Sequence, residues 1–112
     1  MEQLKEFEEI RAQVPVNEIL TVVAEEAAEL SHAALKLRRT IIPDNPTDEA
    51  ITFRKAKANL YEETADVLCA LMASGLFGKD ELDILLPSLI KHKLKRWADR
   101  LKEQQQKAGG AV

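Results

Sequence analysis

Apolar residues recur every three to four positions along most of this chain. The pattern covers residues 2 to about 13, 18 to about 39, 47 to 74, 79 to 86, and 87 to 103. Such spacing is typical of amphipathic helices, and no segment shows the period-two alternation of a strand. We therefore predict an all-α protein, a helical bundle of three long helices and one or two short ones.

Proline, glycine and capping residues set the predicted boundaries. Pro15 ends the first helix, and Asn17 is the expected N-cap of the second. Thr47 starts the third helix, Gly75 ends it, and Pro87 opens the last one. We predict a single domain over residues 1–103 and a disordered tail over 104–112, where no packing face remains.

Two long helices each carry a pair of carboxylates three residues apart, Glu26 with Glu29 and Glu63 with Asp66. That spacing makes the members of each pair neighbours on one helix face. Glu26 falls inside an apolar stripe with Glu29 at its edge, and Glu63 and Asp66 repeat the arrangement. The first stripe comprises Ile19, Val22, Val23, Leu30, Ala33 and Leu37, and the second Ala56, Leu60, Val67, Ala70 and Leu71.

Direction matters here more than spacing. Glu6 and Glu9 have the same spacing, yet Glu9 points away from the apolar stripe of its helix and Glu6 lies only at the border. That pair is expected to be solvated. Glu is a good helix former, so spacing alone carries little weight.

Carboxylates aimed at an apolar interior cost several kcal/mol unless they are paired or bind a metal. A site made of carboxylates without His or Cys suits a hard cation, Mg²⁺ or alternatively Mn²⁺. The natural chemistry is metal-assisted attack of water on a phosphoryl group. If the second and third predicted helices run antiparallel, their carboxylate pairs would lie at different heights along the helix axes. The pairs can then face each other only if the third helix is broken or bent, which we expect between Ala50 and Ala56.

Composition excludes several classes of protein. The start of the chain lacks the features of a signal peptide, and the apolar run 65–73 is too short to span a bilayer, so we expect a cytoplasmic protein with no membrane partner. Cys69 reads as a small buried hydrophobe. Residues 91–107 carry a charge of +5 against −8 for the rest. We expect this basic helix to present a solvated face; a nucleic-acid interface is the less favoured alternative, because no aromatic interleaving or known recognition motif accompanies it.

The motifs Glu25-Glu26-x-x-Glu29-Leu30 and Glu62-Glu63-x-x-Asp66-Val67 resemble the signature of the MazG-like, all-α nucleoside triphosphate pyrophosphohydrolases. The likeness extends over most of residues 17 to 101. It implies hydrolysis of a nucleoside triphosphate to monophosphate and pyrophosphate, with Glu26, Glu29, Glu63 and Asp66 as catalytic residues that hold Mg²⁺. Which carboxylate activates water stays open.

Substrate contacts are expected from basic and amide side chains near the carboxylates or on the C-terminal helix. The candidates are Lys36, Lys55, Asn59, Lys91, Lys95 and Arg96. For Lys36 and Lys55, an ordinary surface position is the more common role of a lysine.

Three alternatives remain beside this hypothesis. One is a non-catalytic helical oligomerisation module whose inward acids pair with Lys93 or Arg96. Another is a phosphoribosyl-ATP pyrophosphohydrolase of the same superfamily. The third is a di-iron carboxylate bundle, which Glu29-x-x-His32 brings to mind, although such bundles use two Glu-x-x-His motifs and only one is present.

The third helix is apolar on nearly all sides from Ala65 to Ala73, and Trp97 lies on the apolar seam of the last helix. One thin chain cannot cover both, so we predict a homo-oligomer, a dimer or a dimer of dimers, that completes the bundle. The substrate pocket is expected to be completed across chains. Relatives in the family that the motifs resemble are commonly dimers or tetramers built from dimers.

Overall fold

The computed structural model describes residues 4–42 and 49–110. Within these residues the chain is all-helical and has no strand, which confirms the predicted all-α class. The elements are α1 (Lys5–Gln13), α2 (Val16–Ile41), α3 (Glu49–Ala73), the π-helical turn η1 (Glu81–Leu85) and α4 (Leu86–Gly110). No helix of the described residues combines the length and the apolar character needed to cross a bilayer.

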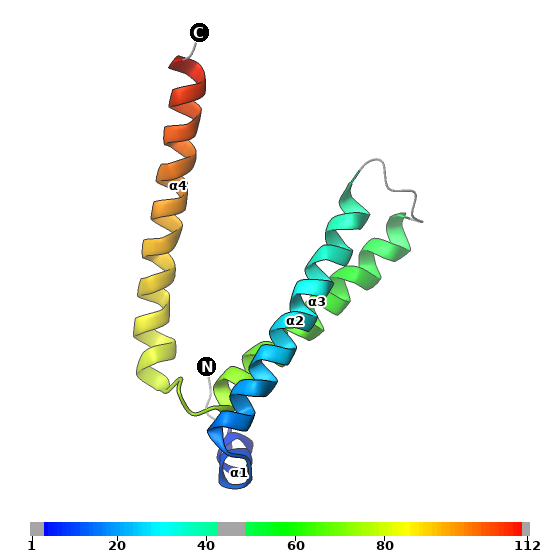
Figure 1. Ribbon diagram of the computed structural model, residues 1–112, viewed down its shortest axis with the longest axis vertical. Helices are drawn as coiled ribbons and strands as arrows, with labels where there is room; N and C mark the ends of the chain where they lie inside the picture. Colours follow the sequence, from blue (N-terminus) through cyan, green and yellow to red (C-terminus); the bar gives the residue numbers. More distant parts are fainter. Residues whose placement is uncertain (1–3, 43–48, 111–112) are drawn as a thin grey trace. The chain divides into compact units, whose positions relative to one another are not determined.

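The chain divides into two compact units. One comprises Gln3–Leu76 with α1, α2 and α3, and the other contains η1 and α4. In the first unit α2 and α3 lie side by side and run antiparallel, and α1 contacts α3 (Figure 1). The single domain over residues 1–103 and the oligomeric bundle stay predictions.

The turn between α1 and α2 is built on Pro15. Val14 is extended, with φ −114° and ψ 121°, as expected of a residue before proline. The carbonyl of Pro15 accepts hydrogen bonds from the backbone N–H groups of Glu18 and Ile19, at 3.0 and 3.1 Å. This carbonyl starts the helix, so α2 begins at Val16 and the prediction of Asn17 as N-cap is wrong. The predicted start of the third helix at Thr47 lies outside the described residues.

Gly75 ends α3 as predicted. Its φ of +77° lies in the left-handed region, and its N–H donates to the carbonyl of Met72 at 3.3 Å. The same carbonyl accepts a hydrogen bond from Nη1 of Arg11 on α1, also at 3.3 Å. A Cβ on residue 75 would stand 2.8 Å from Cδ of Arg11. The end of α3 is thereby tied to α1.

The core of the first unit is thin. Its buried apolar residues are Ile19, Ala33, Ala70, Met72 and Ala73. Residues 65–73 are not buried on most sides within one chain, in agreement with the expectation that one thin chain cannot cover this apolar segment.

Four of those residues are exposed: Ala65, Asp66, Leu68 and Cys69. The prediction of Cys69 as a buried hydrophobe is therefore wrong. The reason is geometric, because within the first unit α3 is contacted by α1 and α2 alone.

The second unit differs from the prediction near Pro87. We expected a short helix that stops before this residue, and the chain instead passes through η1 directly into α4. The N–H of Leu86 donates to the carbonyl of Glu81, five residues back, and Pro87 has no N–H to offer the ladder. A widened turn thus accommodates the proline.

Helix α4 is long and exposed. Its apolar seam stays open to solvent, with Leu94 56% and Trp97 64% exposed. The helix continues to Gly110, although we expected disorder from residue 104 onward. Lys95 and Asp99 form an ion pair at 2.9 Å, one helical turn apart.

Candidate metal centre

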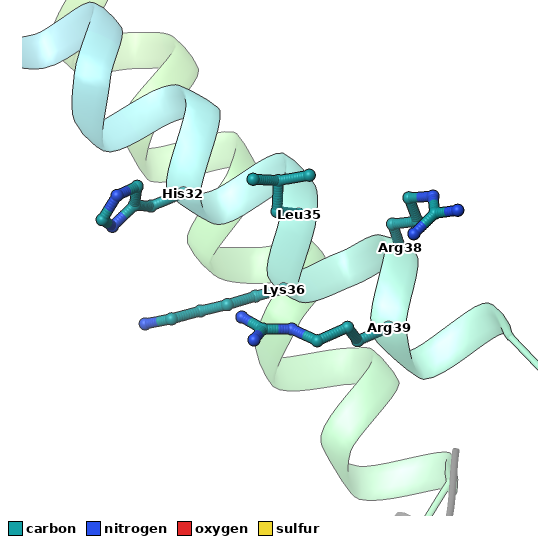
Figure 2. A pocket seen from close by; sticks show the side chains of 5 residues that line it. All are labelled: His32, Leu35, Lys36, Arg38 and Arg39. Carbon is teal, nitrogen blue, oxygen red and sulfur yellow. The ribbon is translucent and has the colours of Figure 1, made fainter. Parts of the chain in front are cut away.

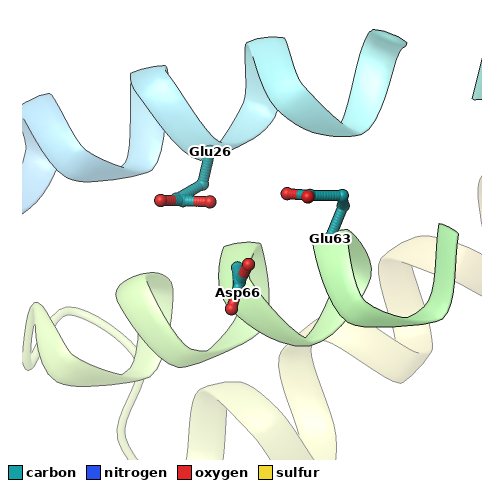
Figure 3. A group of neighbouring side chains, drawn as sticks. All are labelled: Glu26, Glu63 and Asp66. Carbon is teal, nitrogen blue, oxygen red and sulfur yellow. The ribbon is translucent and has the colours of Figure 1, made fainter. Parts of the chain in front are cut away.

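Three carboxylates from two helices converge between α2 and α3. Glu26 of α2 faces Glu63 and Asp66 of α3, and one oxygen of each lies within 4.8 Å of the others (Figure 3). Glu26 and Glu63 are half-buried and Asp66 is exposed. The inward direction predicted for Glu26 and Glu63 agrees with this placement.

Glu26 on α2 and Glu63 on α3 lie at the same height along the helix axes, although α3 has no break. Glu26 lies fifteen residues before the end of α2 at Ile41, and Glu63 fourteen residues after the start of α3 at Glu49. At 1.5 Å per residue these distances are about 22 and 21 Å. The predicted break between residues 50 and 56 is therefore wrong. Helix α2 is longer than expected, and α3 is one uninterrupted α-helix from Glu49 to Ala73.

Glu29 does not join the cluster. It is exposed at the edge of the α2 stripe, as its angular position predicted, and the group of close oxygen atoms omits it. Its charge still acts on Glu63. As a direct ligand Glu29 stays a prediction.

Burial raises the pKa of Glu63 above its usual value of 4.5, and the negative charges of Asp66, Glu29, Glu26 and Glu62 raise it further. Every neighbour that acts on this carboxyl is an acid. A cation among these oxygens would remove the repulsion and favour the charged form.

Within the described part of the chain, Glu26, Glu63 and Asp66 have no ion-pair partner. Asp99 provides a contrast, since the hydrogen bond from Lys95 and the charge of that ammonium hold its pKa below the usual value.

The surface pair that served as a comparison behaves as predicted. Glu6 and Glu9 are both exposed on α1 and belong to no carboxylate cluster of the described residues. Equal spacing thus gives a cluster only where the helix face points at a second acidic helix.

An apolar hollow of about 310 Å³ adjoins the carboxylates. Glu26 and Asp66 line it, together with Cys69. Its remaining lining is apolar and consists of Ile10, Val14, Ile19, Val22, Ala70 and Ala73. The sequence did not single out the α1 side chains for this role, because nothing in the stripe of α1 says which helix it meets.

The predicted substrate-contact residues are spread over both units. In the first unit Lys36 and Lys55 are exposed and Asn59 is half-buried on α3, one turn before Glu63. In the second unit, α4 carries the other three candidates, Lys91, Lys95 and Arg96, all of them exposed.

His32 is exposed on α2 and is not among the clustered ligands. The described residues therefore offer an all-oxygen site with no imidazole, which disfavours the di-iron arrangement.

Comparisons with models of known protein families, with curated proteins and with solved structures found no match to this chain.

Proposed function

We propose that this protein hydrolyses a nucleoside triphosphate to the nucleoside monophosphate and pyrophosphate, with Mg²⁺ held by Glu26, Glu63 and Asp66. The observation that carries the proposal is the convergence of these three carboxylates within 4.8 Å, without a cationic partner in the described residues. The likeness of both motifs to the MazG-like enzymes supports the same reaction.

The donor set fits a hard divalent ion. Octahedral Mg²⁺ binds oxygen at about 2.0–2.1 Å, so its ligand atoms lie roughly 3 to 4 Å apart. Oxygens within 4.8 Å of one another reach that range by small side-chain rotations. Mn²⁺ prefers similar oxygen ligands and is the alternative. We expect Glu29, one turn from Glu26, to add a ligand or to hold a metal-bound water.

The carboxylates and the metal ion have separate roles in the proposed reaction. Glu26, Glu63 and Asp66 would bind the divalent ion and fix its position. The bound ion would neutralise negative charge on the phosphate oxygens. The oxygen of a water molecule forms a bond to one phosphorus of the α–β linkage, and the bridging P–O bond breaks. A carboxylate of the site accepts the proton that this water loses, and pyrophosphate and the monophosphate leave.

The apolar hollow beside Glu26 and Asp66 accommodates the rest of the substrate. Its walls are aliphatic, and its volume of about 310 Å³ suits a nucleobase with part of its sugar. Few polar groups line it, so base discrimination by hydrogen bonding is expected to be weak.

The test is a substrate panel with product analysis. Purified protein with Mg²⁺ is incubated with canonical, deoxy and modified nucleoside triphosphates and with phosphoribosyl-ATP. We expect monophosphate and pyrophosphate in equal amounts from at least one of them, and loss of the reaction in Glu63→Gln but not in Glu9→Gln. Orthophosphate as the first product, or no turnover across the panel, would refute the proposal.

The second candidate is a helical oligomerisation module without catalysis, and the exposed apolar residues favour it. Leu68 is 45% and Tyr61 61% exposed on α3, and the α4 seam is open as well. If Glu63→Gln unfolds the metal-free protein, the carboxylate has a structural role in an assembly and this candidate gains.

Oligomerisation is compatible with both candidates, and we propose a homodimer, or a dimer of dimers, in which a second copy covers these faces. Light scattering at micromolar concentration tests it. A monomer that retains full activity would exclude the assembly and the completion of the pocket across chains.

A further inference from the structure

A hollow of about 400 Å³ on α2 is lined by four basic or imidazole side chains and no acid. Its lining comprises His32, Leu35, Lys36, Arg38 and Arg39. Figure 2 shows that His32, Lys36 and Arg39 extend to the same side of the helix, whereas Arg38 points to the other side. Three nitrogen-bearing side chains thus line one side of the hollow.

The spacing explains why these three side chains gather. His32, Lys36 and Arg39 follow one another at intervals of four and three residues, which places them along one stripe of α2. The same stripe continues toward the N-terminus through Glu29 and Glu25 at the same intervals. One helix face therefore changes from acidic to basic along its length.

The basic side chains of this α2 stripe tilt toward its acidic, N-terminal end. Side chains on an α-helix tilt toward its N-terminus, so the head group of Lys36 covers the turn before its own Cα. Lys36 lies ten residues after Glu26, the α2 carboxylate of the metal centre, a rise of about 15 Å, of which the tilt closes part. A phosphate chain that extends from the carboxylates along α2 toward its C-terminus therefore runs toward these basic side chains.

We infer that His32, Lys36 and Arg39 form an anion-binding site for the terminal phosphates of the nucleotide held at the carboxylates. The inference rests on the proposed function for its ligand. Lys offers three ammonium donors, Arg a planar fork that matches two phosphate oxygens, and His a ring N–H. Glu25 and Glu29 repel an anion at the other end of the stripe, so the phosphate chain is held at the basic end.

Lys36 is available for this role. Within the described part of the chain it has no ion-pair partner, whereas Lys95 on α4 is engaged with Asp99 at 2.9 Å. Isolated exposed lysines contribute little to binding, whereas here Lys36 shares one acid-free hollow with an imidazole and guanidinium groups.

The experiment uses the full chain labelled with ¹⁵N and inorganic pyrophosphate as the probe, in EDTA so that no metal takes part. Saturable shifts of backbone amide signals are expected in residues 32–39. Lys36→Gln should weaken this binding roughly threefold, and the Lys36→Gln/Arg39→Gln double variant about tenfold or more. Because the site is exposed, added salt should weaken it as well.

Lys57→Gln is the matched control, since Lys57 is exposed on α3, lies 5.8 Å from the centre of the Tyr61 ring and does not line the hollow. Glu63→Gln should keep the pyrophosphate shifts even though it removes the metal-dependent reaction. Failure of the proposed reaction and failure of the anion site therefore give different results.

In turnover, Lys36→Gln should raise KM with little change in kcat, because it removes binding and not chemistry. No saturable shift in residues 32–39, or shifts that persist in the double variant, would overturn the anion site. Pyrophosphate binding with an unchanged KM would overturn its assignment to the nucleotide.

Discussion

Stabilisation by Mg²⁺ is the most direct test of the three-carboxylate cluster, because it needs no knowledge of the substrate. An ion that binds only the folded protein stabilises it by RT ln(1 + [L]/Kd), which is about 1.4 kcal/mol when free Mg²⁺ is ten times Kd. For a chain of this length that corresponds to a rise in Tm of roughly 5 °C. We expect such a rise in the unaltered protein.

Glu63→Gln should abolish the rise at the same Mg²⁺ concentration. The change removes one of three oxygen donors that lie within 4.8 Å of each other, while amide and carboxylate have nearly the same shape. Loss of even a supporting group around a metal weakens affinity about 10- to 100-fold, and loss of a ligand should weaken it at least as much.

The assay is thermal unfolding followed by circular dichroism, over a Mg²⁺ series at constant ionic strength. Glu9→Gln is the control, because Glu9 is an exposed carboxylate with the same i, i+3 spacing to Glu6 on α1. Equal Mg²⁺ responses in the unaltered protein and in Glu63→Gln would refute the assignment of the cluster as a metal site. A rise that Glu9→Gln also loses would mean that the ion acts on overall charge.

Further predictions concern pH, the end of α3 and the cysteine. The raised pKa of Glu63 means that the folded state holds this proton to higher pH than the unfolded state does. The contribution of Glu63 to stability is therefore fully present below about pH 4.5 and is lost as the pH rises through the raised pKa. In EDTA, Glu63→Gln should thus gain stability over the unaltered protein toward neutral pH and match it below about pH 4, as urea midpoints will measure. Gly75→Ala should lower stability by about 1–2 kcal/mol from the φ of +77° alone, and more because Arg11 must move; unchanged urea midpoints would contradict this. Arg11→Gln should cost about 1 kcal/mol through the lost hydrogen bond to the end of α3, with a similar loss in Arg11→Ala as the check. Cys69 is exposed within one chain and should react with a maleimide in the folded monomer nearly as fast as in urea; strong protection in the monomer would contradict its placement.

The all-helical class and the end of α3 at Gly75 were readable because local signals determine them. The inward direction of Glu26 and Glu63 was readable for a similar reason, since helical periodicity fixes which residues share a face. The absence of Glu29 from the carboxylate cluster could not be predicted. A residue at the edge of an apolar stripe can point into or out of the helix interface, depending on the angle at which the two helices pack.

Other errors came from tertiary context. Asn17 has the side chain of an N-cap, but the carbonyl of Pro15 takes the role because the proline sets the chain direction two residues earlier. The exposure of Cys69 depends on how many helices surround α3, and no local pattern contains that number. Lys36 was a candidate substrate contact from the sequence, but His32 and Arg39 were not grouped with it, although their intervals of four and three on one stripe are a readable signal.

The antiparallel pairing of α2 and α3 also determines where a chain with this site can accept insertions during evolution. One residue inserted within α3 before Glu63 turns its carboxylate by about 100° and moves it about 1.5 Å along the axis, which takes it out of reach of Glu26. Residues added between the two helices do neither, provided that the helices keep their levels. Related chains should therefore differ freely in the length of that connection and hardly at all in the count from the helix ends to the acids. Their kinship would be hidden from any comparison that expects a constant distance between the two motifs.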